Sequence, residues 1–534
     1  MNWSEKGLFT LLLILLCLSS PLVCSRAWAG DLAGMPSAAS DGQQVQPRSG
    51  SDQPGSPPPG HPGGGRPQGV VSPQAAPGPP ASSGLAGGGA QLEQPVLIGA
   101  FFLLVGAAIS GLLLFKKKID LATSRERLVI MGLLGLGLVT RLVLAGLMTG
   151  HPYDMGLFAN WASAAARDLG GVYSNNRVDY PPLYMYVLYL TGKALNLSWL
   201  HQYSTVILKL PAIFADLATS YLIFSRARKH LNPILASFLA AFYLFNPAVL
   251  INSSLWGQVD SFFTCLLVAA LIMLAENRVS WASVLFAAAV LMKPQGIIFL
   301  PVLFFELVRQ KDGKLGLKSV GMAAVSLLVI ILPFALRQGP FWIIELYMKT
   351  LGEYPFASVN AFNLFNLLGA NYTRYTEFWG FMSYQNWGIF FIVAVTALSW
   401  FVYARANNIK MVWAAGLLLI SGVFTLATGM HERYLFPALA LSLFTFIYLG
   451  DRRFLFMAGG FSVSIFLNTH AVLFATIRGV HSLAGAGIPT FTAILNLLLL
   501  VYLVKVMLDI AVVNRSKAML ISEFDNQKAL TDCQ

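Results

Sequence analysis

Residues 231–277 read LNPILASFLAAFYLFNPAVLINSSLWGQVDSFFTCLLVAALIMLAEN, and this stretch shows the pattern of the chain. It holds two apolar runs, 231–250 and 259–276, separated by a short polar break. Helices of about this length match the thickness of a bilayer. The 534 residues are 56% hydrophobic and only 11% charged, whereas a soluble domain has about 25% charged residues. We therefore expect an integral membrane protein.

Similar apolar runs recur from residue 95 to residue 508. They predict an all-α, multi-pass membrane bundle of about 13 transmembrane helices. The runs 281–293 and 296–309 are short, and could form two short helices that meet at Lys293-Pro294-Gln295. The run 184–197 is interpreted as an interfacial or re-entrant helix. The predicted spans lie near 95–115, 127–148, 204–225, 231–250, 259–276, 281–293, 296–309, 318–335, 387–404, 410–428, 434–450, 453–469 and 487–508.

The two ends of the chain differ from this core. Residues 1–29 are typical of a secretory signal, with an apolar run before the cleavage pattern Ala27-Trp28-Ala29, although an uncleaved anchor helix is the alternative. Residues 30–92 contain 15 Gly and 12 Pro but no Phe, Trp or Tyr, which predicts a disordered tether. Residues 93–515 would form the membrane core, and residues 516–534 a cytoplasmic tail.

The net charge of +12 comes from basic clusters between the apolar runs. With the predicted spans, these clusters all fall on one side of the membrane. That side is assigned to the cytoplasm, because cytoplasmic loops carry an excess of Lys and Arg. The charge is thereby explained without a nucleic acid partner. The clusters are Lys116-Lys117-Lys118 with Arg125 and Arg127; Arg226, Arg228 and Lys229; Arg309, Lys311, Lys314 and Lys318; Arg405 and Lys410; and Arg452 and Arg453.

Polar residues with chemical character gather on the other, outer side. Ionisable groups near a membrane are costly and usually functional. Because they cluster at one interface, a lipid-linked substrate is favoured over a solute that crosses the bilayer. The segments are the loop 149–203 with Asp154 and Asp179-Tyr180-Pro181-Pro182, then Asn246-Pro247, Trp256-Gly257-Gln258-Val259-Asp260, Lys293-Pro294-Gln295, the loop 336–386, and His431-Glu432-Arg433-Tyr434.

Several of these residues have both a chemical and a structural interpretation. Asp154 could accept a proton from an attacking hydroxyl, or it could cap a helix that begins near Met155. Arg433 could bind phosphate oxygens through its guanidinium fork, or it could snorkel to the interface. Lys293 could balance a phosphate charge or cap the preceding helix. Trp256 could stack on a sugar, although interfacial Trp is common without any ligand.

In this order, the motifs resemble those of the GT-C superfamily of membrane glycosyltransferases, which use polyprenyl-phosphate sugars. The chain is similar to bacterial and archaeal mannosyltransferases related to the GPI second mannosyltransferase. It is also similar to the dolichyl-phosphate-glucose glucosyltransferases, which share an Asp-Tyr-Pro-Pro-Leu turn. The resemblance covers about residues 127–450. It rests on Tyr153-Asp154, Asp179-Tyr180-Pro181-Pro182-Leu183, Lys209-Leu210-Pro211 through Asp216, Asn246-Pro247, Trp256-Gly257-Gln258-Val259-Asp260, Lys293-Pro294-Gln295 and His431-Glu432-Arg433-Tyr434.

The resemblance implies a helical bundle with a large first extracytoplasmic loop that bears juxtamembrane helices. It also implies an inverting transfer with an acidic general base in that loop, which would be Asp154, with Asp179 in reserve. The donor phosphate would be bound by Arg433, His431 and Lys293. Further substrate contacts would come from Tyr180, Trp256, Gln258, Asp260, Gln295, Glu432 and Tyr434.

The expected function is therefore that of a hexosyltransferase in the cell membrane, with mannose as the favoured sugar. It would move the sugar from a polyprenyl-phosphate donor to a lipid, glycan or protein acceptor on the extracytoplasmic face. A transporter or flippase of lipid-linked sugar is the alternative, and a scaffold is a third. No cofactor is implied with certainty. A divalent cation stays open, since Asp154, Asp179 and Asp260 could meet.

Overall fold

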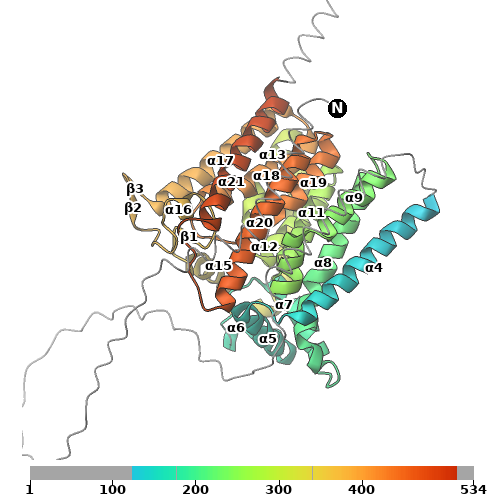
Figure 1. Ribbon diagram of the computed structural model, residues 1–534, viewed down its shortest axis with the longest axis vertical. Coiled ribbons are helices and arrows are strands. Elements are labelled where there is room, and N and C mark those ends of the chain that lie inside the picture. The colour runs from blue at the N-terminus through green and yellow to red at the C-terminus, as the bar shows by residue number, and fades with distance from the viewer. Residues whose placement is uncertain (1–122, 176, 340, 514–534) are drawn as a thin grey trace, which may run out of the picture. The chain divides into compact units, whose positions relative to one another are not determined.

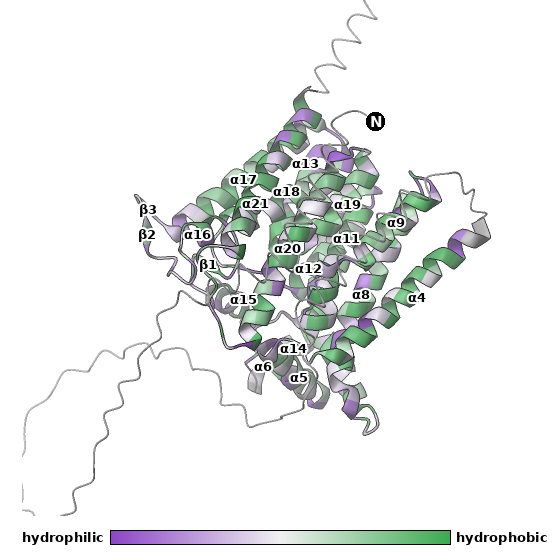
Figure 2. Cartoon of the chain, viewed as in Figure 1, coloured by the Kyte–Doolittle hydropathy of each residue, from purple (hydrophilic) through white to green (hydrophobic). Residues whose placement is uncertain are grey.

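A computed structural model of the chain describes residues 123–175, 177–339 and 341–513 (Figure 1). The described residues are mostly helical, at 76%, and hydrophobic residues extend along most of the helices (Figure 2). Both observations agree with an all-α membrane protein. The predicted leader, tether, first span at 95–115, the three lysines Lys116-Lys117-Lys118 and the polar tail lie outside the described residues.

Within the described ranges, seven helices are long and apolar enough to cross a membrane, and a bent pair raises this number to at most eight. A helix needs about 20 residues to span the hydrocarbon core. The bent pair joins α9 (Pro233–Leu244) to α10 (Pro247–Leu250) and the π-helical turn η2 (Ile251–Trp256), at an angle of 42°. The seven helices are α4 (Thr123–Leu147), α8 (Ser204–Ala227), α14 (Gly313–Ala335), α17 (Tyr384–Ala406), α18 (Val412–Leu426) together with the preceding 3-10 turn from Ile409, α20 (Arg453–Ile477) and α21 (Ile488–Leu508).

Four other predicted spans coincide with shorter helices. These are α11 (Asp260–Ala275), α12 (Val279–Met292), α13 (Leu300–Gln310) and α19 (Pro437–Leu449), with 16, 14, 11 and 13 residues. The expected break at Lys293-Pro294-Gln295 is present, because α12 ends at Met292 and a 3-10 turn, η3 (Pro294–Phe299), precedes α13. The expected number of about 13 spans therefore stays a prediction.

The connections between the long helices carry short elements. Between α4 and α8 lie α5 (Pro152–Arg167), α6 (Val172–Asn175), α7 (Pro182–Leu195) and η1 (His201–Tyr203). Between α14 and α17 lie α15 (Trp342–Gly352), β1 (Ser358–Val359), α16 (Leu364–Leu367), β2 (Phe378–Trp379) and β3 (Met382–Ser383). The remaining short elements are η4 (Ile409–Met411), β4 (Met430–His431) and η5 (Asp509–Val513).

Two of these elements join distant parts of the chain. Strand β1 pairs in parallel with β4, so that Val359 lies opposite His431. Strands β2 and β3 pair with each other in antiparallel fashion. The β1–β4 pair thus brings the segment between α14 and α17 next to the segment that follows α18.

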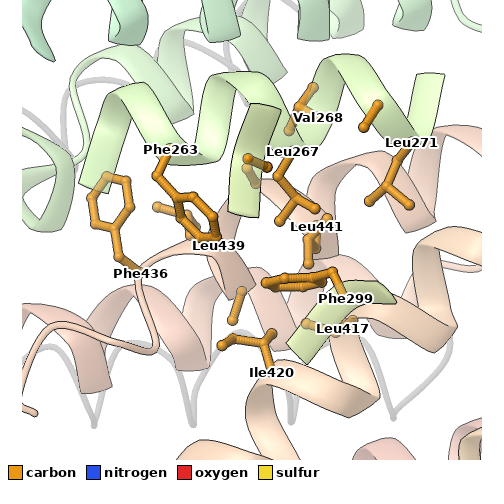
Figure 3. Packing of buried hydrophobic residues seen from close by; sticks show 14 of the residues in the cluster. Phe263, Leu267, Val268, Leu271, Phe299, Leu417, Ile420, Phe436, Leu439 and Leu441 are labelled. Atoms are coloured by element: carbon orange, nitrogen blue, oxygen red, sulfur yellow. The ribbon is translucent and has the colours of Figure 1, made fainter. Parts of the chain in front are cut away.

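The centre of the bundle is closely packed around α11. Figure 3 shows α11 side chains facing residues of α18 and α19, with Phe299 of η3 between them. The rings of Phe263 and Phe299 have centroids 6.2 Å apart. Burial of side chains of this size contributes about 1.5–3 kcal/mol each. The labelled residues are Phe263, Leu267, Val268, Leu271, Phe299, Leu417, Ile420, Phe436, Leu439 and Leu441.

Two opposite charges inside the spanning helices form a buried ion pair. Arg141 Nε of α4 lies 3.1 Å from Asp216 Oδ2 of α8, and neither side chain is exposed. Arg141 also donates a hydrogen bond of 2.6 Å to the carbonyl of Leu244, at the end of α9. The pair therefore joins three helices and leaves neither charge uncompensated.

Ion pairs also identify one end of the bundle. Arg226 and Lys229 at the end of α8 pair with Glu276 at the end of α11, and Arg228 pairs with Glu126 near the start of α4. The start of α11 lies about 24 Å along that helix from Glu276, at 1.5 Å per residue. The residues that precede α11 and α19 meet those that follow α12 at that other end.

Candidate functional site

Three segments far apart in the sequence meet the start of α5 at one end of the bundle. They are the turn before α11, the break after α12 and the segment between α18 and α19. Side-chain contacts link them in series from Asp154 to Tyr434. The linked residues that the sequence singled out are Asp154, Trp256, Gln258, Asp260, Lys293, His431, Glu432, Arg433 and Tyr434.

Asp154 is the third residue of α5 and does not cap it. The helix begins at Pro152, and its N-cap is His151, whose Nδ1 accepts the Asp154 N–H at 3.4 Å. The expectation that Asp154 caps a helix beginning near Met155 is therefore wrong. Proline at the first helical position has a φ angle suited to the helix and needs no N–H partner there. The Asp154 carboxylate is thereby left for other contacts.

The Asp154 carboxylate is held through one of its two oxygens. Trp256 Nε1 and Gln258 Nε2 each donate a hydrogen bond of 2.6 Å to Oδ2. In the part of the chain that the structure describes, Oδ1 accepts no hydrogen bond. The side chain is 13% exposed. One oxygen is thus fixed and the other is left for a ligand.

The charge of Asp154 is stabilised by its surroundings. Burial raises the pKa of the carboxyl, but the charges of Arg433 and His151 and the two hydrogen bonds outweigh burial, so that the pKa is below its ordinary value. Asp154 is therefore ionised at neutral pH.

Trp256 is buried beside this carboxylate. It is only 1% exposed, the His151 ring stacks on it at a centroid distance of 4.9 Å, and the Arg433 guanidinium lies 5.6 Å from its centre. In this arrangement the indole orients Asp154 through its N–H, and its face is not open to a sugar.

The basic residues are paired with carboxylates. Lys293 forms a buried ion pair with Asp260, which also accepts a hydrogen bond of 3.1 Å from Asn252 Nδ2. Arg433 pairs with Glu432, and its Nε lies 3.8 Å from Asp260 Oδ2. The guanidinium of Arg433 thus points into the cluster and does not snorkel away from it.

Among the buried donors that have no hydrogen-bond partner in the described residues are two that the sequence singled out, Arg433 Nε and Gln295 Nε2. Buried polar groups are nearly always hydrogen-bonded, so each such exception calls for an explanation. A polar or anionic ligand would satisfy both donors.

His431 is a neutral group in this cluster. Burial and the nearby charges of Arg433 and Lys293 hold the pKa of its imidazole well below the ordinary value. Its ring meets Tyr354 edge-on at 4.5 Å and lies 5.0 Å from Tyr434. His431 can therefore offer a hydrogen bond to a phosphate, but no positive charge.

Tyr180 lies to one side of this cluster, in an aromatic group. Its ring is 5.4 to 5.9 Å from the rings of Phe158, Trp161 and Tyr184. Tyr180 also accepts a hydrogen bond on its carbonyl from the Tyr173 hydroxyl, at 2.7 Å. It thus anchors the turn that contains Asp179.

Asp179 meets a carboxyl group that the sequence did not single out. Glu353, at the end of α15, shares a hydrogen bond with the Asp179 side chain, and Thr350 Oγ1 donates to the Asp179 carbonyl at 2.9 Å. Burial raises the pKa of Asp179. Burial and the Asp179 charge raise the pKa of Glu353 to about 7. The two carboxyl groups therefore share a proton below neutral pH.

The three carboxylates considered for a divalent cation have separate partners. Asp154 is held by Trp256 and Gln258, Asp179 by Glu353, and Asp260 by Lys293. In the described ranges, no group of three or more His, Cys, Asp or Glu side chains could hold a metal ion.

Three residues of this site were given no role from the sequence. His151 precedes a proline, and that pair could have indicated the helix start at Pro152. Asn252 lies in the polar break between the runs 231–250 and 259–276, beside Ser253 and Ser254, and such a break between two apolar runs could have drawn attention to it. For Glu353 the sequence gives no signal, because its contact depends on how two long connections fold.

Comparison with known proteins gives no further guidance, since no family model and no curated protein matches the chain.

Proposed function

We propose that this protein is a membrane glycosyltransferase of the GT-C type. In this proposal it transfers a hexose, with mannose favoured, from a polyprenyl-phosphate donor to a lipid, glycan or protein acceptor. The reaction takes place at the extracytoplasmic face of the cell membrane, and the donor reaches the site laterally through the bilayer.

The single observation that best supports this proposal is the state of Asp154. It is ionised, and its Oδ2 is fixed by hydrogen bonds from Trp256 and Gln258. Its Oδ1 accepts no hydrogen bond from the described residues. A general base needs both an ionised form and a free oxygen within reach of the proton. Arg433, with its unpartnered Nε, lies close enough to lower the Asp154 pKa.

The transfer uses these groups in one step. The acceptor hydroxyl gives its proton to Asp154 while its oxygen attacks C1 of the hexose. The bond between C1 and the phosphate oxygen breaks, and its electron pair leaves with the lipid phosphate. Attack opposite the leaving group inverts the configuration at C1. Positive charge from Arg433 stabilises the phosphate as charge develops on it.

Transport of a lipid-linked sugar is less well supported. Transport across the bilayer favours ionisable groups near the midplane that line a pathway. Arg141 and Asp216, the charges that the sequence indicates inside the spans, are fully buried and paired with each other. Their contacts serve helix packing.

The proposal is tested by incubating purified protein with polyprenyl-phosphate mannose, and then with the glucose analogue, against lipid, glycan and peptide acceptors. We expect sugar transfer to at least one acceptor, with inversion at C1. Asp154→Asn should abolish transfer while folding and donor binding persist. The control is Asp168→Asn on the same helix, because Asp168 is half-exposed and pairs with Arg337 away from the cluster.

Two results would contradict the proposal. If Asp154→Asn transfers sugar at the wild-type rate, Asp154 is not the base. If the wild-type protein transfers no sugar but moves the donor across proteoliposome membranes, the protein is a flippase.

A further inference from the structure

We propose that Lys209 is a positioning residue, which fixes the Trp256-Gly257-Gln258 turn against Asp154 by binding the carbonyl groups at two helix ends. This inference rests on the proposed function for its effect on transfer. The predicted effect of Lys209 on the position of the turn does not depend on the proposed function.

Lys209 is an unusual buried lysine. It lies on α8 with no exposed surface, and in the described part of the chain it forms no ion pair with a carboxylate. Its Nζ instead donates to backbone carbonyls, at 2.7 Å to Met148, 2.9 Å to Ser254 and 3.3 Å to Ala145. The Leu255 carbonyl lies at 3.5 Å.

These carbonyls belong to the C-terminal ends of two elements. Ala145 and Met148 are at the end of α4, and Ser254 and Leu255 are in the last turn of η2. The last carbonyls of a helix have no partner within it and carry partial negative charge. A buried ammonium group that binds both ends therefore holds α4 and η2 together.

The turn that follows η2 has little room to move. Gly257 has a φ of +88°, and a Cβ there would lie 2.3 Å from Met155 Sδ and 3.4 Å from Lys209 Cε. The Trp256 carbonyl accepts the His151 N–H at 3.0 Å. The turn is thus packed between Lys209 on one side and the start of α5 on the other.

The chain of contacts from Lys209 to Asp154 is short. Ser254 and Leu255, which Lys209 binds, are followed directly by Trp256 and then by Gln258, which donate to Asp154 Oδ2. If Nζ is removed, the carbonyls at the end of η2 lose a buried donor. The turn can then shift, and both donors to Asp154 shift with it.

The test compares Lys209→Met, which keeps the length and removes the donor, with the wild-type protein. We expect faster hydrogen exchange of the amides in residues 251–259 and at least a tenfold loss of transfer rate. The acid limb of the rate should move to higher pH, because Asp154 loses the donors that favour its ionised form. His151 and Arg433, which also face Asp154, keep their places.

Lys209→Gln keeps two N–H donors for at least three carbonyls and should give effects intermediate between wild type and Lys209→Met. It also tests the inference if Lys209→Met does not fold. The matched control is Lys193→Met, an exposed lysine on α7, which should exchange and react like wild type. Wild-type exchange in 251–259 for Lys209→Gln would overturn the inference. If wild type itself transfers no sugar, the proposed function fails, while faster exchange in the variants would still support the positioning role.

Discussion

At the scale of single residues, the site combines fixed and unsatisfied groups. Asp154 Oδ2 is held by two donors, whereas Arg433 Nε and Gln295 Nε2 are buried without a hydrogen-bond partner among the described residues. Fixed groups are oriented in advance of binding, which lowers the cost of reaching the reactive geometry. Unsatisfied donors indicate where a ligand oxygen would be bound.

Arg433 gives the prediction at this scale. Arg433→Ala should weaken donor binding tenfold to about a hundredfold, since a hydrogen bond to a charged group contributes roughly 1.5–3 kcal/mol. Arg433→Lys should restore binding only in part, because lysine offers a point charge without the fork. The measurement is binding of the polyprenyl-phosphate sugar to purified variants, with the exposed Arg374→Ala as control. If Arg433→Ala binds the donor with wild-type affinity, Arg433 does not bind the phosphate. The phosphate site would then have to lie at Lys293 or in the connection between α4 and α8.

The sequence predicted which residues lie together in the site better than it predicted which of them form ion pairs with each other. Trp256, Lys293 and Arg433 were expected at one interface, and they do lie together. That Arg433 pairs with its neighbour Glu432 was not predictable, because adjacent residues meet only in particular side-chain conformations. Glu353 was missed because its partner, Asp179, lies 174 residues earlier in the chain.

At the scale of elements, helix positions were predicted well, whereas the membrane role of the shorter helices stays a prediction. Every predicted run within the described ranges coincides with helix. Hydropathy does not distinguish a spanning helix from a short helix buried in protein, because both surroundings are apolar. The helices α11, α12 and α19 have 13 to 16 residues, and most of their side chains are buried. Their apolar character is therefore explained by packing as well as by lipid.

The contact between α15 and the Asp179 turn gives a prediction of pH-dependent stability. The folded-state pKa of Glu353 is raised to about 7. A raised pKa means that this group's stabilising contribution is present at low pH and is lost as the pH rises through about 7. The melting temperature of the wild-type protein should therefore fall between pH 6 and pH 8, relative to that of Glu353→Gln.

Melting in detergent at the two pH values measures this difference. Glu345→Gln, an exposed glutamate on the same helix, should follow the wild-type protein. Because Glu353 is only partly buried, solvent screening keeps the effect small. Parallel melting curves for the wild-type protein and Glu353→Gln would show that the two carboxyl groups do not share a proton.

At the scale of the whole molecule, charge separates the two ends of the bundle. Arg226, Arg228 and Lys229 lie at one end, where they pair with Glu276 and Glu126. The cluster around Asp154 lies at the other end. If this bundle crosses a membrane, the rule that basic loops stay in the cytoplasm predicts that the cluster lies on the extracytoplasmic side. That side also suits a substrate whose lipid tail stays in the bilayer and whose sugar lies at the interface.

Cysteine labelling in intact cells tests this orientation. In a chain whose four native cysteines are replaced, the first pair of variants is Tyr153→Cys on α5 and Ser198→Cys before α8. The second pair is Lys229→Cys and Lys410→Cys at the basic end, and all four positions are exposed. A membrane-impermeant thiol reagent should label the first pair directly and the second pair only after the cells are made permeable. Labelling of Tyr153→Cys and Lys229→Cys from the same side would contradict a bundle that crosses the membrane between them. The reverse pattern would keep the bundle and place the cluster in the cytoplasm, where a donor displayed on the outer leaflet could not reach Asp154.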